Sequence, residues 1–299
     1  MNLLKPAAPL LTLLPAMALV PVFIVTWTGL HGGGLSIWQQ FLSGALHPSL
    51  DPDVLHAVWH GLGVTMATAF LSWSLSLLFG VLLGSVCADV VWRSWSLPTW
   101  PAIGLRRGLA IPRAVHELVW GLLLLQVFGL HPYVAVAAIA IPYSALVARI
   151  WRDHLDSADH RPLHALISAG VHPLSALMTA LNPGVGSVLM SYGGYRLECA
   201  LRSATLLGVF GLGGLGTELQ LTLQSLQFRE LWTGLWVLAA VMLILEQLLR
   251  FWRKRSGVGV HGQRRILLFG LLAIAFGVIG TFWLRHIVPD QFSGLSWFG

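Results

Sequence analysis

The 299-residue sequence has little charge, almost no lysine and only two cysteines. Asp, Glu, Lys and Arg together make up 10% of the chain, whereas soluble domains carry about a quarter. Hydrophobic residues reach 56%, which is more apolar surface than one water-facing core could bury, so an ordinary soluble domain is excluded. Cys87 and Cys199 lie in apolar stretches, and we interpret them as packing residues rather than as redox or metal groups.

Motifs for catalysis are also missing. The sequence contains no G-x-x-x-x-G-K-[ST] phosphate loop, so this chain cannot by itself be an ATPase, and we expect it to bind no cofactor. It has no nucleophile elbow either. The spacing of Asp53, His56 and His60 could suit zinc, but a position at a membrane interface explains the same residues, and we predict no metal site.

Seven apolar runs approach the roughly 20 residues that a helix needs to cross a bilayer. They lie near 7–28, 57–87, 110–130, 132–151, 184–210, 231–250 and 265–285. The sequence therefore predicts an all-α membrane protein with six or seven transmembrane helices, in which residues 29–56 form an external connection. The first run could alternatively be a signal peptide, because Lys5 precedes it and Ala16-Met17-Ala18 resembles a cleavage site.

The basic residues predict an orientation. The 18 Lys and Arg residues form no single stripe of the kind that binds nucleic acid, so we expect no nucleic-acid partner despite the net charge of +6. Most of them lie before the first run or after the second, fourth and sixth, whereas Arg229 and Arg285 lie on the opposite side. The positive-inside rule then places the N-terminus in the cytoplasm and the C-terminus outside.

A polar segment, residues 152–183, separates the fourth and fifth runs. Pro162 suits a helix start, and Leu163, Leu166 and Ile167 then share one face at helical spacing. Gly170 can end that helix by adopting positive φ. The segment near 162–178 is either an amphipathic helix that docks on another protein or a solvated linker in the headgroup region, and physics alone leaves both open.

Three stretches of the chain resemble a known family. The frame His164-Ala165-Leu166, Gly170 and Pro183 is similar to the EAA loop of permease subunits in binding-protein-dependent ABC importers, although His164 replaces the usual Glu and Asn182 the usual Leu. Residues 106–120 and 193–216 on either side of it resemble phosphonate-type permeases. The similarity covers roughly residues 55–250.

The resemblance implies a type I ABC importer permease fold in the bacterial inner membrane. Cytoplasmic ATPase subunits, which hydrolyse ATP, an external solute-binding protein and a second permease copy are the implied partners, and a phosphonate, phosphite or phosphate-like oxyanion is the implied solute. The residues expected to couple to the ATPase are Leu163, His164, Ala165, Leu166, Ile167, Gly170 and Pro183. The expected parts are a first helix and external connection (1–56), a core (57–250), and a basic loop with an extra helix (251–299).

Charged residues interrupt the fifth run. Arg196, Glu198 and Arg202 each cost about 2.5–3.5 kcal/mol inside a membrane unless they face protein or water. Glu198 and Arg202 are spaced i, i+4, which leaves one arginine in surplus. That surplus suits an anionic solute, but a structural ion pair explains the same residues. The predicted path or ion-pair residues are Tyr195, Arg196, Glu198, Arg202, Ser203 and Thr205.

A glycine-rich stretch follows the charges. Its spacing matches a dinucleotide fingerprint, but no βαβ unit surrounds it, so a close-packed helix bend is the better interpretation. The resemblance places this bend near an external gate, formed by Gly208, Gly211, Gly213, Gly214 and Gly216.

Two other classes of function fit parts of the sequence. An ion-coupled secondary transporter or anion channel could use Arg196, Glu198 and Arg202 as gating charges. A membrane enzyme could use Glu198 with a histidine, but the run 184–210 contains no histidine.

Overall fold

The computed structural model describes residues 17, 19–25, 29, 34–255 and 260–287. The first apolar run, the possible signal peptide and Lys5 lie mostly or wholly outside this part. The elements, in chain order, are α2 (Gly34–Leu46), α3 (Pro52–Cys87), α4 (Asp89–Ser94), α5 (Trp100–Gly108), α6 (Ala110–Ala114), α7 (Glu117–Phe128), α8 (Pro132–Ser157), α9 (Arg161–Ser168), α10 (Pro173–Ala180), α11 (Asn182–Leu207), the π-helix η1 (Gly208–Leu212), α12 (Leu215–Gln224), α13 (Phe228–Arg255) and α14 (Val260–Ile287).

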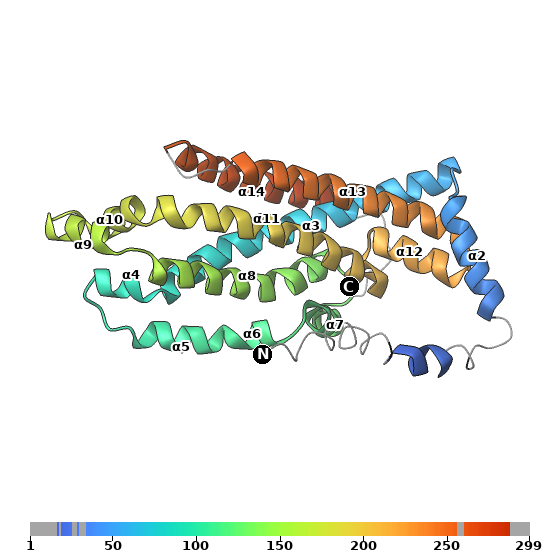
Figure 1. Ribbon diagram of the computed structural model, residues 1–299, viewed down its shortest axis with the longest axis horizontal. Helices are drawn as coiled ribbons and strands as arrows, with labels where there is room; N and C mark the ends of the chain where they lie inside the picture. The colour runs from blue at the N-terminus through green and yellow to red at the C-terminus, as the bar shows by residue number, and fades with distance from the viewer. Residues whose placement is uncertain (1–16, 18, 26–28, 30–33, 256–259, 288–299) are drawn as a thin grey trace, which may run out of the picture.

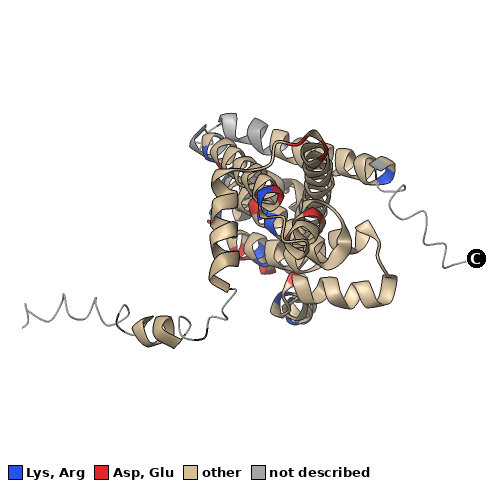
Figure 2. Ribbon diagram, turned by 90° about the vertical axis from the view of Figure 1, so that its right-hand side faces the viewer, with Lys and Arg blue, Asp and Glu red and all other residues tan. Residues whose placement is uncertain are grey.

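The long helices lie side by side along the length of the molecule (Figure 1). At one end lie α4, α9 and α10, and at the other lie α2 and α12, so the predicted cytoplasmic segment and the predicted external segments are at opposite ends. Viewed along the bundle, the ribbon is mostly tan, with charged residues at few positions (Figure 2).

Four described helices are long and apolar enough to span a membrane: Pro52–Cys87, Pro132–Ser157, Phe228–Phe251 and Leu268–His286. Two further pairs, Trp100–Ala114 with Glu117–Phe128 and Val188–Leu212 with Leu215–Gln224, pass the same test together but are bent by 87° and 57°. The described residues thus offer up to six spans. The predicted all-α membrane class is confirmed.

The core is built on the close approach of α3 and α8. A Cβ at Gly80 would lie 2.5 Å from the Val147 side chain, and one at Gly84 would lie 2.6 Å from Ala148 O, so these glycines allow the two helices to touch. Trp73 fills the centre of this core, and its indole N–H donates to Gly193 O of α11 (2.7 Å).

The third predicted run does not form one straight helix. It breaks at Val115, whose extended backbone (φ −104°, ψ 128°) ends α6, and His116 then caps α7 by accepting from Leu118 N (3.3 Å). Hydropathy could not reveal this break because apolar residues continue on both sides of it. As a result, α7 starts against α8, with Glu117 in its first turn.

The external connection contains a helix, which the sequence analysis did not predict. Helix α2 packs on α13: Trp232 Nε1 donates to Phe41 O (2.7 Å) and Trp236 Nε1 donates to Ala45 O (3.1 Å). Gly44 allows this contact, because a Cβ there would lie 3.0 Å from the Phe228 backbone.

The glycine-rich stretch bends the chain between α11 and α12. Gly211, Gly213 and Gly214 have φ of 86°, 89° and 87°, which side chains rarely tolerate. Leu215 N, at the start of α12, donates to Thr65 Oγ1 (2.9 Å) of α3. The bend is therefore a defined backbone feature, whereas its role as an external gate stays a prediction.

Candidate functional site

A polar cluster joins three helices that belong to the candidate membrane spans. Glu117 comes from the start of α7, Tyr143 from the middle of α8 and Ser203 from α11. Ser203 Oγ donates to Glu117 Oε1 (2.7 Å), Tyr143 Oη donates to the same oxygen (3.4 Å), and the two hydroxyls lie 3.0 Å apart. Tyr143 and Ser203 are each only 4% exposed. Polar groups buried this deeply depend on one another for hydrogen bonds.

Arg196 lies beside this cluster and is surrounded by aromatic rings. Its guanidinium carbon lies 4.6 Å from the ring centre of Tyr143 and 5.1 Å from that of Tyr192. Its Nε donates to Tyr192 Oη (2.8 Å). Within the described part of the chain, Arg196 forms no salt bridge, so its outer N–H groups face no carboxylate. A cation held by rings keeps its capacity for an anion.

The structure adds one carboxylate to the charges that the fifth run contributes to this region. The fifth run alone has one arginine more than it has carboxylates. The structure brings a further carboxylate, Glu117, to this region, where it accepts a hydrogen bond from Tyr143, 26 positions along the chain. Arg196 and Arg202 then stand against Glu117 and Glu198, so the four formal charges cancel. Arg196 is the arginine left over after Glu198 pairs with Arg202, and it has no acidic partner among the described residues. Glu117 balances its formal charge only when the region is counted as a whole.

The ion pair predicted in the fifth run is present, on the outer face of α11. Arg202 Nη2 donates to Glu198 Oε1, and the Arg202 side chain is 63% exposed. Tyr195, one turn earlier, is also exposed. Thr205 lies seven residues after Glu198 and so on the same side of the helix, but it is buried and donates to Leu201 O (3.0 Å). The six predicted residues therefore do not share one environment: Tyr195 and Arg202 are exposed, whereas Ser203 and Thr205 are buried.

The predicted coupling segment consists of two short helices, α9 and α10, joined at Gly170. Gly170 has φ of 85°, and Val171 N and Gly170 N donate to Leu166 O (3.1 Å) and Ile167 O (3.0 Å), which is a Schellman helix end. Pro183 lies in the first turn of α11. The expected helix stop at Gly170 is confirmed, but one helix over 162–178 is not observed.

The apolar face of α9 points into the molecule rather than outward. Leu163 is 1% exposed and packs with Trp151, Leu155 and Ala176, and Leu166 and Ile167 are partly buried against the same cluster. His164 and Ala165 are exposed. Leu163 therefore anchors α9 to its own chain, and a partner could reach only the opposite side of this helix.

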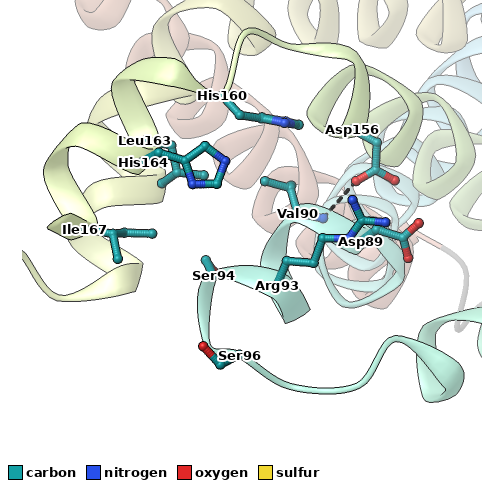
Figure 3. Close-up of a pocket in the computed structure, with 10 residues that line it drawn as sticks. All are labelled: Asp89, Val90, Arg93, Ser94, Ser96, Asp156, His160, Leu163, His164 and Ile167. Atoms are coloured by element: carbon teal, nitrogen blue, oxygen red, sulfur yellow. Dashed lines mark hydrogen bonds between the residues drawn. The ribbon is translucent and has the colours of Figure 1, made fainter.

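A cleft of about 370 Å³ lies between α9 and α4. Figure 3 shows His160 and His164 on one side of it and Asp89, Arg93 and Asp156 on the other. The two carboxylates are already engaged. Asp156 Oδ1 accepts from Val90 N (3.0 Å), and Asp89 Oδ1 lies 2.6 Å from Arg106 Nη2.

Arg106 joins the helix ends behind this cleft. Its Nε and Nη2 donate to Cys87 O (2.8 and 2.6 Å), and Nη2 also lies 3.5 Å from Asp156 Oδ2. This one side chain from α5 therefore holds the C-terminal ends of α3 and α8 and the start of α4. We call Arg106, Asp89 and Asp156 the Arg106 node.

The overall arrangement matches a known class of membrane protein. An amino acid ABC transporter, crystallised with histidines, aligns with a TM-score of 0.55 and 22% sequence identity over 67% of this chain and 94% of that chain. The chain thus has the fold of ABC importer permeases, as the sequence resemblance implied.

The names of sequence relatives are more specific than those of the structural neighbours. A phosphite transport system permease protein of Stutzerimonas stutzeri is 28% identical over 134 residues, which cover 45% of this chain and 49% of that protein. Another protein of that organism, provisionally named a phosphite transport system permease, is 26% identical over 72% of this chain and 73% of its own length. The chain spans about half the length of the first two curated relatives it matches. No protein-family model matches it.

Glu117 is the site residue that sequence reasoning missed. It lies in the stretch 106–120, which resembles phosphonate-type permeases. Its neighbours along the chain gave no sign that it would meet Ser203, because that contact joins residues 86 positions apart. The available signal was a carboxylate among apolar residues. As for Glu198, a charge in such a stretch predicts a compensating polar partner elsewhere in the fold.

Proposed function

We propose that this chain is the membrane permease subunit of an ABC importer that moves a small phosphorus oxyanion, such as phosphite, phosphate or a phosphonate, into the cytoplasm. The fold and the named relatives support the transport class. The observation that carries the solute class is Arg196, a membrane-embedded arginine held by rings and one phenol without an acidic partner among the described residues. Its planar fork of donors matches oxyanion oxygens.

A second copy of this chain would cover the outer face of α11. Tyr195 and the Glu198–Arg202 pair are exposed there, on a helix that crosses the bilayer. Facing lipid, the two charges would cost about 2.5–3.5 kcal/mol each. A face that carries them therefore lies against protein or a water-filled path. Two copies meeting around such a path satisfy both conditions.

The ATPase subunits would dock at the end that holds α9 and α10. Three large apolar side chains are exposed on the corner between these helices: Val171, Leu174 and Met178. They follow the exposed His164 and Ala165, so the docking surface is the outer side of the pair. With Leu163 buried beneath it, the surface is backed by the protein's own core, which allows it to transmit force as a rigid body.

In this proposal the ATPase hydrolyses ATP, and its closure would move α9 and α10 and so favour one of two arrangements of the spans. The end with α9 and α10 faces the cytoplasm, and an external binding protein delivers the oxyanion at the end with α2 and α12. The chain itself supplies no catalytic group.

One experiment tests the assembly. The chain is purified together with an ABC ATPase subunit from the same cell, and ATP hydrolysis is measured with and without the oxyanion-loaded binding protein. We expect the loaded binding protein to raise the hydrolysis rate. Failure of the chain to associate with any ATPase would refute the proposal.

A cross-linking experiment tests the second copy. With Cys87 and Cys199 replaced by alanine, Tyr195→Cys should join two copies through a short bifunctional thiol reagent in membranes. Ile244→Cys is the matched control, because Ile244 is also exposed on a spanning helix but lies on α13. Equal cross-linking at both positions would show that α11 has no special contact between copies.

A further inference from the structure

In the cluster of Glu117, Tyr143 and Ser203, two hydroxyl groups donate to one carboxylate oxygen. We infer that the Glu117 carboxylate is an internal placeholder, which occupies the binding site for the oxyanion when no solute is present and is displaced when one arrives. This inference rests on the proposed function.

The geometry supports the exchange. Two hydroxyls, Ser203 Oγ and Tyr143 Oη, converge on a single oxygen of Glu117, at 2.7 and 3.4 Å. A carboxylate and a phosphorus oxyanion accept hydrogen bonds from the same kinds of donor. On the other side of Tyr143, the Arg196 guanidinium stacks 4.6 Å from the ring centre. Tyr143 therefore contacts both the Glu117 carboxylate, through its hydroxyl, and Arg196, through its ring. Arg196 has no acidic partner among the described residues.

The position of Glu117 suits a side chain that must move away from the two hydroxyls when the oxyanion binds. It lies directly after the break between α6 and α7, and its side chain is 15% exposed, whereas Tyr143 and Ser203 belong to continuous helices and are buried. The second carboxylate oxygen, Oε2, lies 3.6 Å from Nε2 of His116, whose side chain is 61% exposed. The carboxylate can thus turn toward His116 without a change in α8 or α11.

The negative charge of Glu117 explains how the exchange would help both the empty permease and the release of the oxyanion. With Glu117 in place, the hydroxyl donors are satisfied in the empty permease, which avoids unpaired polar groups in the membrane. An arriving oxyanion must replace that carboxylate, and its return helps to release the oxyanion. Removing the negative charge should therefore strengthen anion binding and slow release, two effects that a purely structural role would not produce together.

The test uses the permease–ATPase complex in lipid nanodiscs without a binding protein. Inorganic phosphite is titrated, and the concentration for half-maximal stimulation of ATP hydrolysis is recorded with the maximal rate. For Glu117→Gln we expect the half-maximal concentration to fall about ten-fold, as removal of one nearby charge predicts, and the maximal rate to fall as well. Glu246→Gln is the control, because Glu246 forms an exposed pair with Arg250 on α13 and should leave both values unchanged.

A second variant tests the same role if the Glu117→Gln permease does not assemble with the ATPase. Tyr143→Phe removes one hydroxyl donor and keeps the ring against Arg196, so the half-maximal phosphite concentration should rise. An unchanged or raised concentration for Glu117→Gln, an unchanged one for Tyr143→Phe, or a wild-type complex that responds only through the binding protein would each overturn the placeholder role. A wild-type complex that phosphite fails to stimulate under any condition, loaded binding protein included, would instead overturn the proposed function.

Discussion

Two arginines at different positions along the helix bundle differ in whether acidic side chains balance their charge. Arg106, at the end with α9 and α10, is held by Cys87 O and by the carboxylates of Asp89 and Asp156. Arg196, among the spanning helices, has three tyrosine rings around it, and the hydroxyl of one of them, Tyr192, accepts from its Nε. The first has its charge balanced by acidic side chains, whereas the second does not within the described residues.

The difference separates a structural charge from an available one. A guanidinium that already has a carbonyl and two carboxylates gains little from a further anion, and losing it would leave those acceptors unpaired. A guanidinium stacked on rings is fixed in position while most of its donors stay free. The comparison can be tested by removing each arginine in turn.

The largest effect is expected at the Arg106 node. Arg106→Ala should lower the free energy of unfolding by about 3 kcal/mol, because it leaves two acidic side chains without their partner in a partly buried site. Thermal unfolding of the purified protein measures the change. Arg107→Ala is the control, since the neighbouring Arg107 is exposed. If both variants unfold alike, the node contributes nothing specific.

Arg196→Gln should affect transport rather than folding. A charge-assisted hydrogen bond to an oxyanion contributes about 1.5–3 kcal/mol, so we expect oxyanion uptake to fall roughly ten- to a hundred-fold. The yield of assembled complex and its unfolding temperature should match the wild type. Loss of the assembled complex would place Arg196 in the same structural class as Arg106 and end the contrast between them.

A backbone variant separates the effect of shape from that of charge. Gly213 has φ 89° and ψ 172°, and a Cβ there would meet only Val64, at 3.9 Å. Gly213→Ala should therefore cost of order 1 kcal/mol through backbone strain alone, visible as a lower unfolding temperature. Gly104→Ala, in helix α5 with open space around its Cβ, is the control and should be neutral or slightly stabilising. Equal unfolding temperatures for the two variants would mean that the bend tolerates a side chain.

The smallest effect is expected for the pair Glu246–Arg250. It has the same i, i+4 spacing as Glu198–Arg202, but it lies near the end of α13 at the predicted cytoplasmic side. Glu246→Gln should change stability by less than about 0.5 kcal/mol and leave transport intact. Glu198→Gln, measured beside it, should reduce uptake. Identical uptake in the two variants would show that position in the bundle does not matter.

Local features of the fold were predictable from the sequence. Apolar runs of spanning length, the helix stop at Gly170 and the glycine bend all depend on residues close together in the chain. The pair Glu198–Arg202 follows in the same way from the helical repeat. The break at Val115 and the helix α2 were missed, because hydropathy reports how apolar a stretch is and not where its backbone turns.

Contacts between distant residues set the limit for the candidate site. Arg196 was identified because a charge stands out in an apolar run, but its aromatic surroundings come from α8 as well as α11. The apolar face of α9 was predicted correctly as a face and assigned to a partner, yet Leu163 packs inside the chain. Spacing identifies which side chains share a face, and it does not identify what that face meets.

The sequence by itself determined the solvent of this protein and the order of its helices, because hydrophobicity, glycine and helical spacing act over one or two turns. Only the tertiary structure decided which charges are balanced. Glu117 reaches Ser203, and Arg106 reaches Asp156, only after α7, α8, α5 and α11 have packed. Electrostatic balance in a medium of low polarity is set by distance in space, which the order of residues does not contain.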